Sequence, residues 1–143
     1  MAFVLDSSVV CKWYVPEVLG DAALRLRDLI ESESRSVAVP RFFFVESANI
    51  LWKKASLKNE LSRSDAKGIY SRILDLPFHV VDDDDLLLQA LNLSLDHSIS
   101  VYDGLYLACA IHSRARLVTA DTVLARRLGG HEHIMHLSEF SKN

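Results

Sequence analysis

Residues 2–8, AFVLDSS, set the pattern for the whole fold, because a run of apolar residues ends abruptly at a carboxylate. The run Ala2–Leu5 has the length and composition of a buried β-strand. Asp6 follows it directly, and Ser7 and Ser8 precede the next apolar residues. Two explanations of Asp6 are open: it caps the helix that follows, or it is a ligand of a metal ion held where the strand ends.

Short apolar runs and longer helical patterns alternate through the rest of the chain. After Ala2–Leu5, the expected strands are Ser36–Val39, Phe78–Val81, Arg116–Thr119 and Ile134–Leu137, with a short extended stretch at Ile99–Val101. The expected helices are Val9–Val15, Asp21–Ser32, Phe42–Ala55, Arg63–Leu74, Leu86–Leu95, Tyr102–Arg114 and Val123–Leu128. This alternation predicts an α/β fold with a central parallel sheet of about four to five short strands, flanked by helices on both faces.

The size and composition of the chain predict one compact domain over residues 1–143, since half of the residues are apolar. No apolar run is long enough to span a bilayer and the N-terminus lacks the pattern of a secretory signal, so we expect a cytoplasmic protein without membrane contact. Cys11 and Cys109 are expected to be buried free thiols. The net charge of −3 argues against coating of nucleic acid by bulk charge, but it permits a nuclease with a local basic rim.

Three aspartates stand where a parallel sheet places its working site, at the carboxyl ends of strands or at helix starts. Asp6 ends the first strand, Asp121 follows RLVT after one alanine, and Asp103 begins the apolar helix VYDGLYLACAI. Each of them has an alternative role as a helix cap, worth about 1 kcal/mol. Spacing alone does not choose between capping and metal binding.

Glu46 is harder to explain as a cap, because it lies inside the apolar stretch FFFVESANILW. It shares a helical stripe with Asn49 and Lys53, so its alternative role is part of a solvated face. Two carboxylates about 4 Å apart repel by roughly 4 kcal/mol at an effective dielectric near 20, so a converging group needs a proton or a cation. An all-oxygen group suits Mg²⁺ or Mn²⁺, and such sites are typical of metal-assisted phosphodiester hydrolysis.

Four blocks of the sequence resemble, in this order, the signature blocks of PIN-domain ribonucleases. They are AFVLDSSVVCKWYVPE, VPRFFFVESANILWK, SVYDGLYLACAI and LVTADTVLARRL. Within that family they look most like the VapC-type toxins of type II toxin–antitoxin pairs, and the resemblance covers nearly the whole chain. It implies an endoribonuclease that depends on Mg²⁺, with Mn²⁺ as a substitute.

The resemblance also implies roles for individual residues. The family's catalytic acidic quartet matches Asp6, Glu46, Asp103 and Asp121. Metal binding falls to Asp6, Asp103 and Asp121, with the first two as direct ligands, while Glu46 and Asp121 complete the shell or position water. Supporting polar side chains match Ser8, Asn49 and Thr119. Ser7 and Ser8 are expected to cap the next helix and to form hydrogen bonds around the site. Gly104 replaces the alanine of many relatives, which loosens the helix start by up to about 1 kcal/mol.

The resemblance implies three kinds of partner: an RNA substrate, a cognate antitoxin that covers the acidic site, and a second copy of the chain in a homodimer. Weak candidates for RNA binding are Lys12, Arg126 and Arg127, each with a solvated surface role as the alternative. Trp13 and Tyr14 are expected to pack in the domain, with stacking on RNA as the alternative.

Two further clusters have simpler interpretations. The acidic run Asp82–Asp85 is expected to cap and charge the N-terminus of the helix that begins at Leu86. The alternating histidines His131, His133 and His136 could bind a transition metal, but they are remote in sequence from the acids.

Four other functions compete with this interpretation. A phosphoacceptor signalling domain would have paired acids after the first strand and a lysine after a late strand, and neither is present. A PIN-like fold that only binds RNA or protein, and a free-standing RNA-processing nuclease without an antitoxin, remain alternatives. A nucleotide-binding Rossmann domain is excluded because no glycine-rich turn follows any strand.

Overall fold

The computed structural model describes residues 2–142 as one α/β domain, so the two end residues of the predicted domain lie outside it. Its centre is a five-stranded sheet in which every pairing is parallel, in the order β3-β2-β1-β4-β5. The strands are β1 (Ala2–Leu5), β2 (Val37–Pro40), β3 (His79–Val81), β4 (Ala115–Thr119) and β5 (Ile134–His136). This confirms the predicted fold class, and the stretch predicted as extended at Ile99–Val101 is not a strand.

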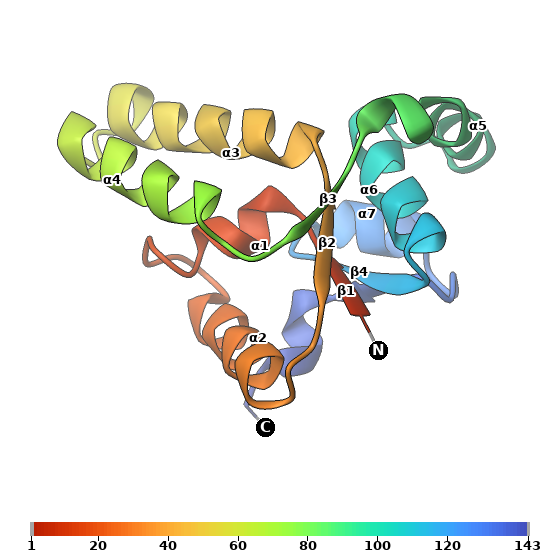
Figure 1. The fold of residues 1–143 in the computed structure, drawn as a ribbon, viewed down its shortest axis with the longest axis horizontal. Helices are drawn as coiled ribbons and strands as arrows, with labels where there is room; N and C mark the ends of the chain where they lie inside the picture. Colours follow the sequence, from red (N-terminus) through yellow and green to blue (C-terminus); the bar gives the residue numbers. More distant parts are fainter. Residues whose placement is uncertain (1, 143) are drawn as a thin grey trace.

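Helices cover the sheet on both faces (Figure 1). They are α1 (Ser7–Cys11), α2 (Gly20–Ser32), α3 (Phe42–Trp52), α4 (Arg63–Leu74), α5 (Leu87–His97), α6 (Val101–His112) and α7 (Thr122–Arg127). A π-helix, Lys53–Leu57, continues α3, and short 3₁₀ turns occupy Asp83–Asp85 and Leu137–Phe140. In Figure 1, α1 and α2 lie on one side of the sheet, and α5 and α6 lie on the other.

The chain order places a switch point between β1 and β4. The chain builds β1, β2 and β3 outward on one side and then returns to add β4 and β5 on the other. Val4 of β1 lies opposite Ala38 of β2 and Leu117 of β4. In open α/β sheets, ligands bind at the carboxyl ends of the strands beside such a point. Asp6 and Asp121 follow the two strands that flank it.

The three central strands, β1, β2 and β4, are almost entirely buried, as expected for parallel strands between helix layers, while the edge strands β3 and β5 are partly exposed. Cys11 and Cys109 lie fully buried as free thiols, which confirms their prediction. Burial raises the pKa of each thiol to about 12, so both stay protonated at neutral pH. Among residues 2–142, no helix has the length and apolar character that a membrane span requires.

The packing of α6 on α5 explains why a glycine stands at position 104, which the sequence did not reveal. Gly104 lies in α6 against α5, and a Cβ at this position would stand 2.6 Å from the carbonyl oxygen of Ala90 and 2.8 Å from Oγ of Ser94. Real Cβ atoms essentially never approach backbone this closely. The glycine therefore lets α5 and α6 pack closely, and the prediction that it only loosens the helix start was incomplete.

The acidic run contacts a different helix from the one predicted. Asp83 Oδ1 accepts a hydrogen bond from the backbone N–H of Phe42 over 3.0 Å, at the start of α3. Asp82 Oδ1 accepts one from Nε of Arg41 over 2.8 Å. The helix α5 begins without any side-chain cap. The prediction that the run caps the helix after Leu86 was wrong, because tertiary packing brings it to the N-terminus of α3, where it satisfies an otherwise unpaired amide.

Candidate active site

A cavity of about 250 Å³ opens at the carboxyl ends of β1 and β4, and all four candidate acids line it. Its lining is Asp6, Ser8, Glu46, Asn49, Ile50, Lys53, Asp103, Tyr106, Thr119 and Asp121. These residues come from four stretches of the sequence that are far apart, around positions 6–8, 46–53, 103–106 and 119–121. The four acids and the three supporting polar residues proposed from the sequence thus face one space.

Asp6 both caps a helix and lines the cavity. Its Oδ1 accepts a hydrogen bond from the backbone N–H of Val9 over 3.2 Å and another from the hydroxyl of Ser8. The cap of α1 is therefore Asp6, and the prediction that Ser7 and Ser8 cap this helix was wrong. Burial raises the pKa of Asp6, against the lowering effect of hydrogen bonds from Ser8, Thr119 and the backbone.

Glu46 is held from two sides within the cavity. Its Oε1 accepts a hydrogen bond from the phenol of Tyr106 over 2.8 Å and another from the hydroxyl of Ser7. Burial raises the pKa of Glu46 against these two hydrogen bonds, and the negative charge of Asp6 raises it further. The alternative of a solvated stripe does not describe Glu46, because its side chain is bonded inside the domain.

Asp103 lies in the first turn of α6 and does not cap it. The cap is Ser100, whose Oγ accepts a hydrogen bond from the backbone N–H of Asp103 over 3.1 Å. Burial raises the pKa of Asp103 to about 6, and the charges of Asp121, Glu46 and Asp6 raise it as well, while a hydrogen bond with Ser100 lowers it. The capping explanation of Asp103 was therefore wrong. Its side chain lines the cavity and does not cap the helix.

Asp121 caps α7 from the end of β4. Its Oδ1 accepts hydrogen bonds from the backbone N–H groups of Val123 and Leu124 over 2.9 and 3.0 Å. Thr119, which is fully buried, accepts a hydrogen bond on Oγ1 from the N–H of Asp121 over 3.0 Å. These bonds occupy one carboxylate oxygen, and the other has no hydrogen-bond partner among residues 2–142.

Sequence reasoning missed Tyr106, and it expected Ser7 to form hydrogen bonds around the site without naming Glu46 as its partner. Both hydroxyls reach Glu46, and Tyr106 is only 2% exposed. One signal was present in the sequence: Tyr106 lies one helical turn after Asp103, so both side chains share a face of α6. A buried tyrosine also needs a partner for its hydroxyl, which points to a polar group nearby.

Within residues 2–142, no group of three or more His, Cys, Asp or Glu side chains stands close enough together to hold one metal ion. The acids share a cavity without converging on a single point. Mg²⁺ keeps several of its waters and binds proteins through only one or two carboxylates, so a set of oxygen donors spread around a small cavity fits a hydrated hard cation. Asp6, Glu46, Asp103 and Asp121 all present carboxylates to this cavity and could contribute to holding such an ion.

The weaker candidates for RNA binding do not share this cavity. Arg127 donates a hydrogen bond to the carbonyl oxygen of Ser98 over 2.7 Å, and Arg126 is exposed on α7. Lys12 pairs with Glu17 over 3.4 Å. None of the three lines the acidic cavity.

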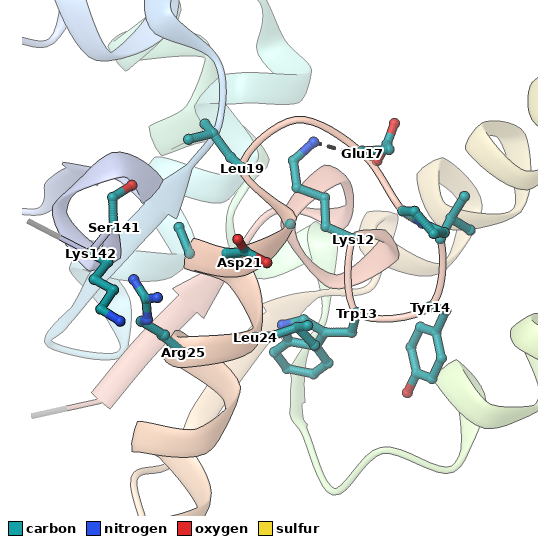
Figure 2. Close-up of a pocket in the computed structure, with 14 residues that line it drawn as sticks. Lys12, Trp13, Tyr14, Glu17, Leu19, Asp21, Leu24, Arg25, Ser141 and Lys142 are labelled. Carbon is teal, nitrogen blue, oxygen red and sulfur yellow. Dashed lines mark hydrogen bonds and ion pairs between the residues drawn. The ribbon is translucent and has the colours of Figure 1, made fainter.

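A larger hollow lies elsewhere, under the loop between α1 and α2, with a volume of about 570 Å³. Figure 2 shows Lys12 and Glu17 on one side of it, and Arg25 with Lys142 on the other. None of the four acids lines this hollow. Trp13 packs at its base, donating through Nε1 to the carbonyl of Ala23 over 2.9 Å, which confirms its predicted packing role.

The three histidines make contacts of a structural kind. His136 accepts a hydrogen bond from the N–H of Ser138 on Nδ1 and caps the last 3₁₀ turn. The His133 ring nitrogen Nδ1 contacts the carbonyl oxygen of Ala115 over 2.8 Å. Burial lowers the pKa of His131, and the rings of His133 and His97 lower it further.

Comparison with known proteins identifies relatives of this chain. A family model described as PIN domain matches residues 3–128. Ribonuclease VapC3 of Pyrobaculum aerophilum is 29% identical over 129 residues, which cover 89% of this chain and 95% of that protein.

Solved structures share the fold. The crystal structure of PAE2754 from Pyrobaculum aerophilum superposes with a TM-score of 0.71 at 23% identity, covering 97% of this chain and 85% of that chain. The structure of VapBC2 from Rickettsia felis bound to a promoter DNA fragment superposes with a TM-score of 0.68 at 13% identity, covering 95% of this chain and 98% of that chain.

Proposed function

Because the chain belongs to the PIN-domain family, we propose that it is a divalent-metal-dependent endoribonuclease and the toxin of a type II toxin–antitoxin pair. The observation that carries this proposal is the convergence of Asp6, Glu46, Asp103 and Asp121 on one small cavity at the switch point of the sheet. The similarity to Ribonuclease VapC3 over most of both chains supports RNA as the substrate.

The electrostatics of the cavity support a bound cation. Burial and neighbouring negative charge raise the pKa of Asp103 to about 6, and burial also raises the pKa values of Asp6 and Glu46. Carboxylates in this condition gain most from a nearby positive charge. Oxygen donors select Mg²⁺ or Mn²⁺, which Asp6 and Asp103 would bind directly, with Asp121 completing the shell.

When bound, the cation supplies Lewis-acid stabilisation of the scissile phosphate and a lower pKa for the attacking water. The side chains of this protein do the rest of the work. Tyr106 and Ser7 hold one oxygen of Glu46, and its Oε2, which has no partner among residues 2–142, is free to orient water for in-line attack. The oxygen of that water bonds to phosphorus as the bond to the leaving ribose oxygen breaks.

The toxin role and its partners rest on the relatives. A solved structure from Klebsiella pneumoniae that shares this fold is a toxin–antitoxin complex by name. This supports an antitoxin as a partner of this chain, and we propose that it covers the acidic cavity. The proposed homodimeric assembly rests on the family resemblance alone. Induced expression is expected to arrest growth with the wild type and not with an Asp103→Asn variant, and co-expression of the cognate antitoxin is expected to relieve the arrest.

Cleavage of end-labelled structured RNA by purified protein tests the enzymatic part. The assay compares Mg²⁺, Mn²⁺ and excess chelator, with an Asp103→Asn variant purified in parallel as the control for contaminating nuclease. We expect cleavage by the wild type alone, abolished by chelator. Equal cleavage by both proteins would remove the support for this site.

A further inference from the structure

A second hollow adjoins the acidic cavity and is lined mainly by lysines. It has a volume of about 210 Å³, and its lining is Ser8, Lys12, Glu17, Ile50, Lys53, Lys54 and Lys58. We call it the lysine hollow. Ser8, Ile50 and Lys53 line both spaces, so the lysine hollow lies directly beside the acidic cavity. A ligand that reaches the four acids therefore has a neighbouring basic space into which it can extend.

Two of the four lysines are already committed to carboxylates. Lys54, only 4% exposed, pairs with Glu17 and, over 3.4 Å, with Glu60. Burial lowers the pKa of Lys54, but the bonds to these two glutamates outweigh it and the pKa is raised. Lys12 pairs with the second oxygen of Glu17 over 3.4 Å, an ion pair marked by a dashed line in Figure 2. These two lysines fix the wall of the hollow rather than offer free charge.

The other two lysines are free. Lys53 and Lys58 are exposed, and neither has an ion pair or a side-chain hydrogen bond within residues 2–142. The π-helix places them together, because the N–H of Lys58 donates to the carbonyl of Lys53 over 3.0 Å and closes one wide turn between them. In an α-helix, residues five apart lie about 140° from each other around the axis, so Lys53 and Lys58 would not share a face without the π-turn. Short π-helical turns are frequent at functional sites.

We infer that Lys53 and Lys58 bind the phosphate backbone of single-stranded RNA next to the scissile bond and so seat the substrate across the two spaces. The identity of the substrate rests on the proposed function. The acids repel phosphate, and the chain carries a net charge of −3, so a polyanion needs a local basic contact beside the cleavage point. Lys53 stands at the junction of the two spaces, and Lys58 extends the contact away from it.

Binding of fluorescein-labelled single-stranded RNA tests this inference, measured by anisotropy in excess chelator at several KCl concentrations. The protein is the wild type, a Lys53→Ala/Lys58→Ala double variant and a Lys67→Ala control. Lys67 is an exposed lysine on α4 that lines neither space. We expect the double variant to bind about ten-fold more weakly and the slope of log Kd against log salt to fall by about 0.7 for each lysine removed. The control is expected to match the wild type.

Each outcome separates this inference from the proposed function. Unchanged affinity and salt slope in the double variant would overturn the inference, even if the wild type cleaves RNA. The same holds if Lys67→Ala weakens binding equally, or if the wild type does not bind RNA. Selective loss of binding in the double variant supports the inference even if no cleavage is found, in which case only the catalytic proposal fails. Metal-induced thermal stabilisation is expected to be equal in the wild type and the double variant, which shows that the acids are intact.

Discussion

The phenol of Tyr106 donates a hydrogen bond to Oε1 of Glu46 over 2.8 Å, joining two residues that lie 60 positions apart in the sequence. Tyr106 is almost completely buried, so its ring is fixed by the core and the hydroxyl cannot turn away. The bond links the rigid interior of α6 to the one acid of the cavity that comes from α3. Tyr106 is a positioning residue in this arrangement.

Tyr106→Phe is expected to lower the free energy of unfolding by about 1 kcal/mol, the usual net value of one hydrogen bond. We also expect kcat for RNA cleavage to fall by roughly ten-fold, with KM unchanged, because Glu46 loses its orientation while the lysine hollow is untouched. Urea unfolding and steady-state cleavage measure the two effects. Tyr102→Phe is the control, since its exposed ring stacks on Phe42 without a hydroxyl bond in the described chain. A rise in KM with kcat unchanged would contradict the positioning role.

Asp103→Asn is expected to stabilise the metal-free protein at neutral pH. The pKa of Asp103 is about 6 in the folded protein and 3.8 when unperturbed. Between pH 3.8 and about 6, Asp103 binds more protons in the folded state than in the unfolded state. The free energy of unfolding therefore falls as the pH rises from about 4 to about 6, and it stays lower above that range. Without metal, the variant should melt several degrees above the wild type at pH 7.5 and close to it near pH 4.

The melting temperatures of the wild type and Asp103→Asn also test metal binding. Adding Mg²⁺ or Mn²⁺ at pH 7.5 is expected to raise the melting temperature of the wild type, because the cation removes the repulsion, and to leave Asp103→Asn nearly unchanged. Differential scanning fluorimetry with and without chelator measures both shifts. A variant that is less stable than the wild type at every pH would argue against repulsion within the cavity.

Gly104→Ala is expected to destabilise the protein by about 1–3 kcal/mol, since the added Cβ meets the carbonyl of Ala90 in a tightly packed contact. Gly68→Ala is a matched control on α4, where nothing lies within 4 Å of the added atom. That change should stabilise the protein by about 0.5–1 kcal/mol through helix propensity. Chemical denaturation of both variants gives the comparison, and stabilisation by both would refute the close packing of α5 on α6.

Asp83→Ala is expected to cost about 1 kcal/mol by removing the bond to the N–H of Phe42. Asp84→Ala, an exposed neighbour without such a bond, should change stability by less than about 0.5 kcal/mol. Urea unfolding of the two variants distinguishes a specific contact with α3 from a general effect of charge. Equal losses would favour the general effect of charge.

The sequence predicted the sheet and the four acids because both depend on local patterns. Strands show as short β-branched runs, and Asp6 and Asp121 stand directly at strand ends, where parallel topology brings them together. The helix limits were less accurate. Ser100 caps α6 earlier than expected, and the α-helical hydrophobic pattern through Lys53 gave no sign that a wide turn begins there.

What the sequence did not reveal depends on tertiary contacts. The partner of Asp83 is the start of a helix 41 positions earlier, so the nearer helix was chosen in its place. The sequence pattern grouped Lys53 with Glu46 and Asn49 but did not connect it with Lys58, since the shared face of the two lysines depends on the π-turn. Likewise, the polar partners of Glu46 come from α1 and α6, which local periodicity cannot place.

The most direct test of the account is a Mn²⁺ titration in which metal occupancy, by electron paramagnetic resonance, and RNA cleavage are followed on the same protein. The titration compares the wild type with Asp103→Asn and with Asp84→Asn, which removes an exposed carboxylate outside the cavity. We predict that occupancy and cleavage rise together in the wild type and in Asp84→Asn and that both are lost in Asp103→Asn. Cleavage that persists in chelator, or Mn²⁺ binding that is equal in all three proteins, would contradict a metal-dependent ribonuclease site at these four acids.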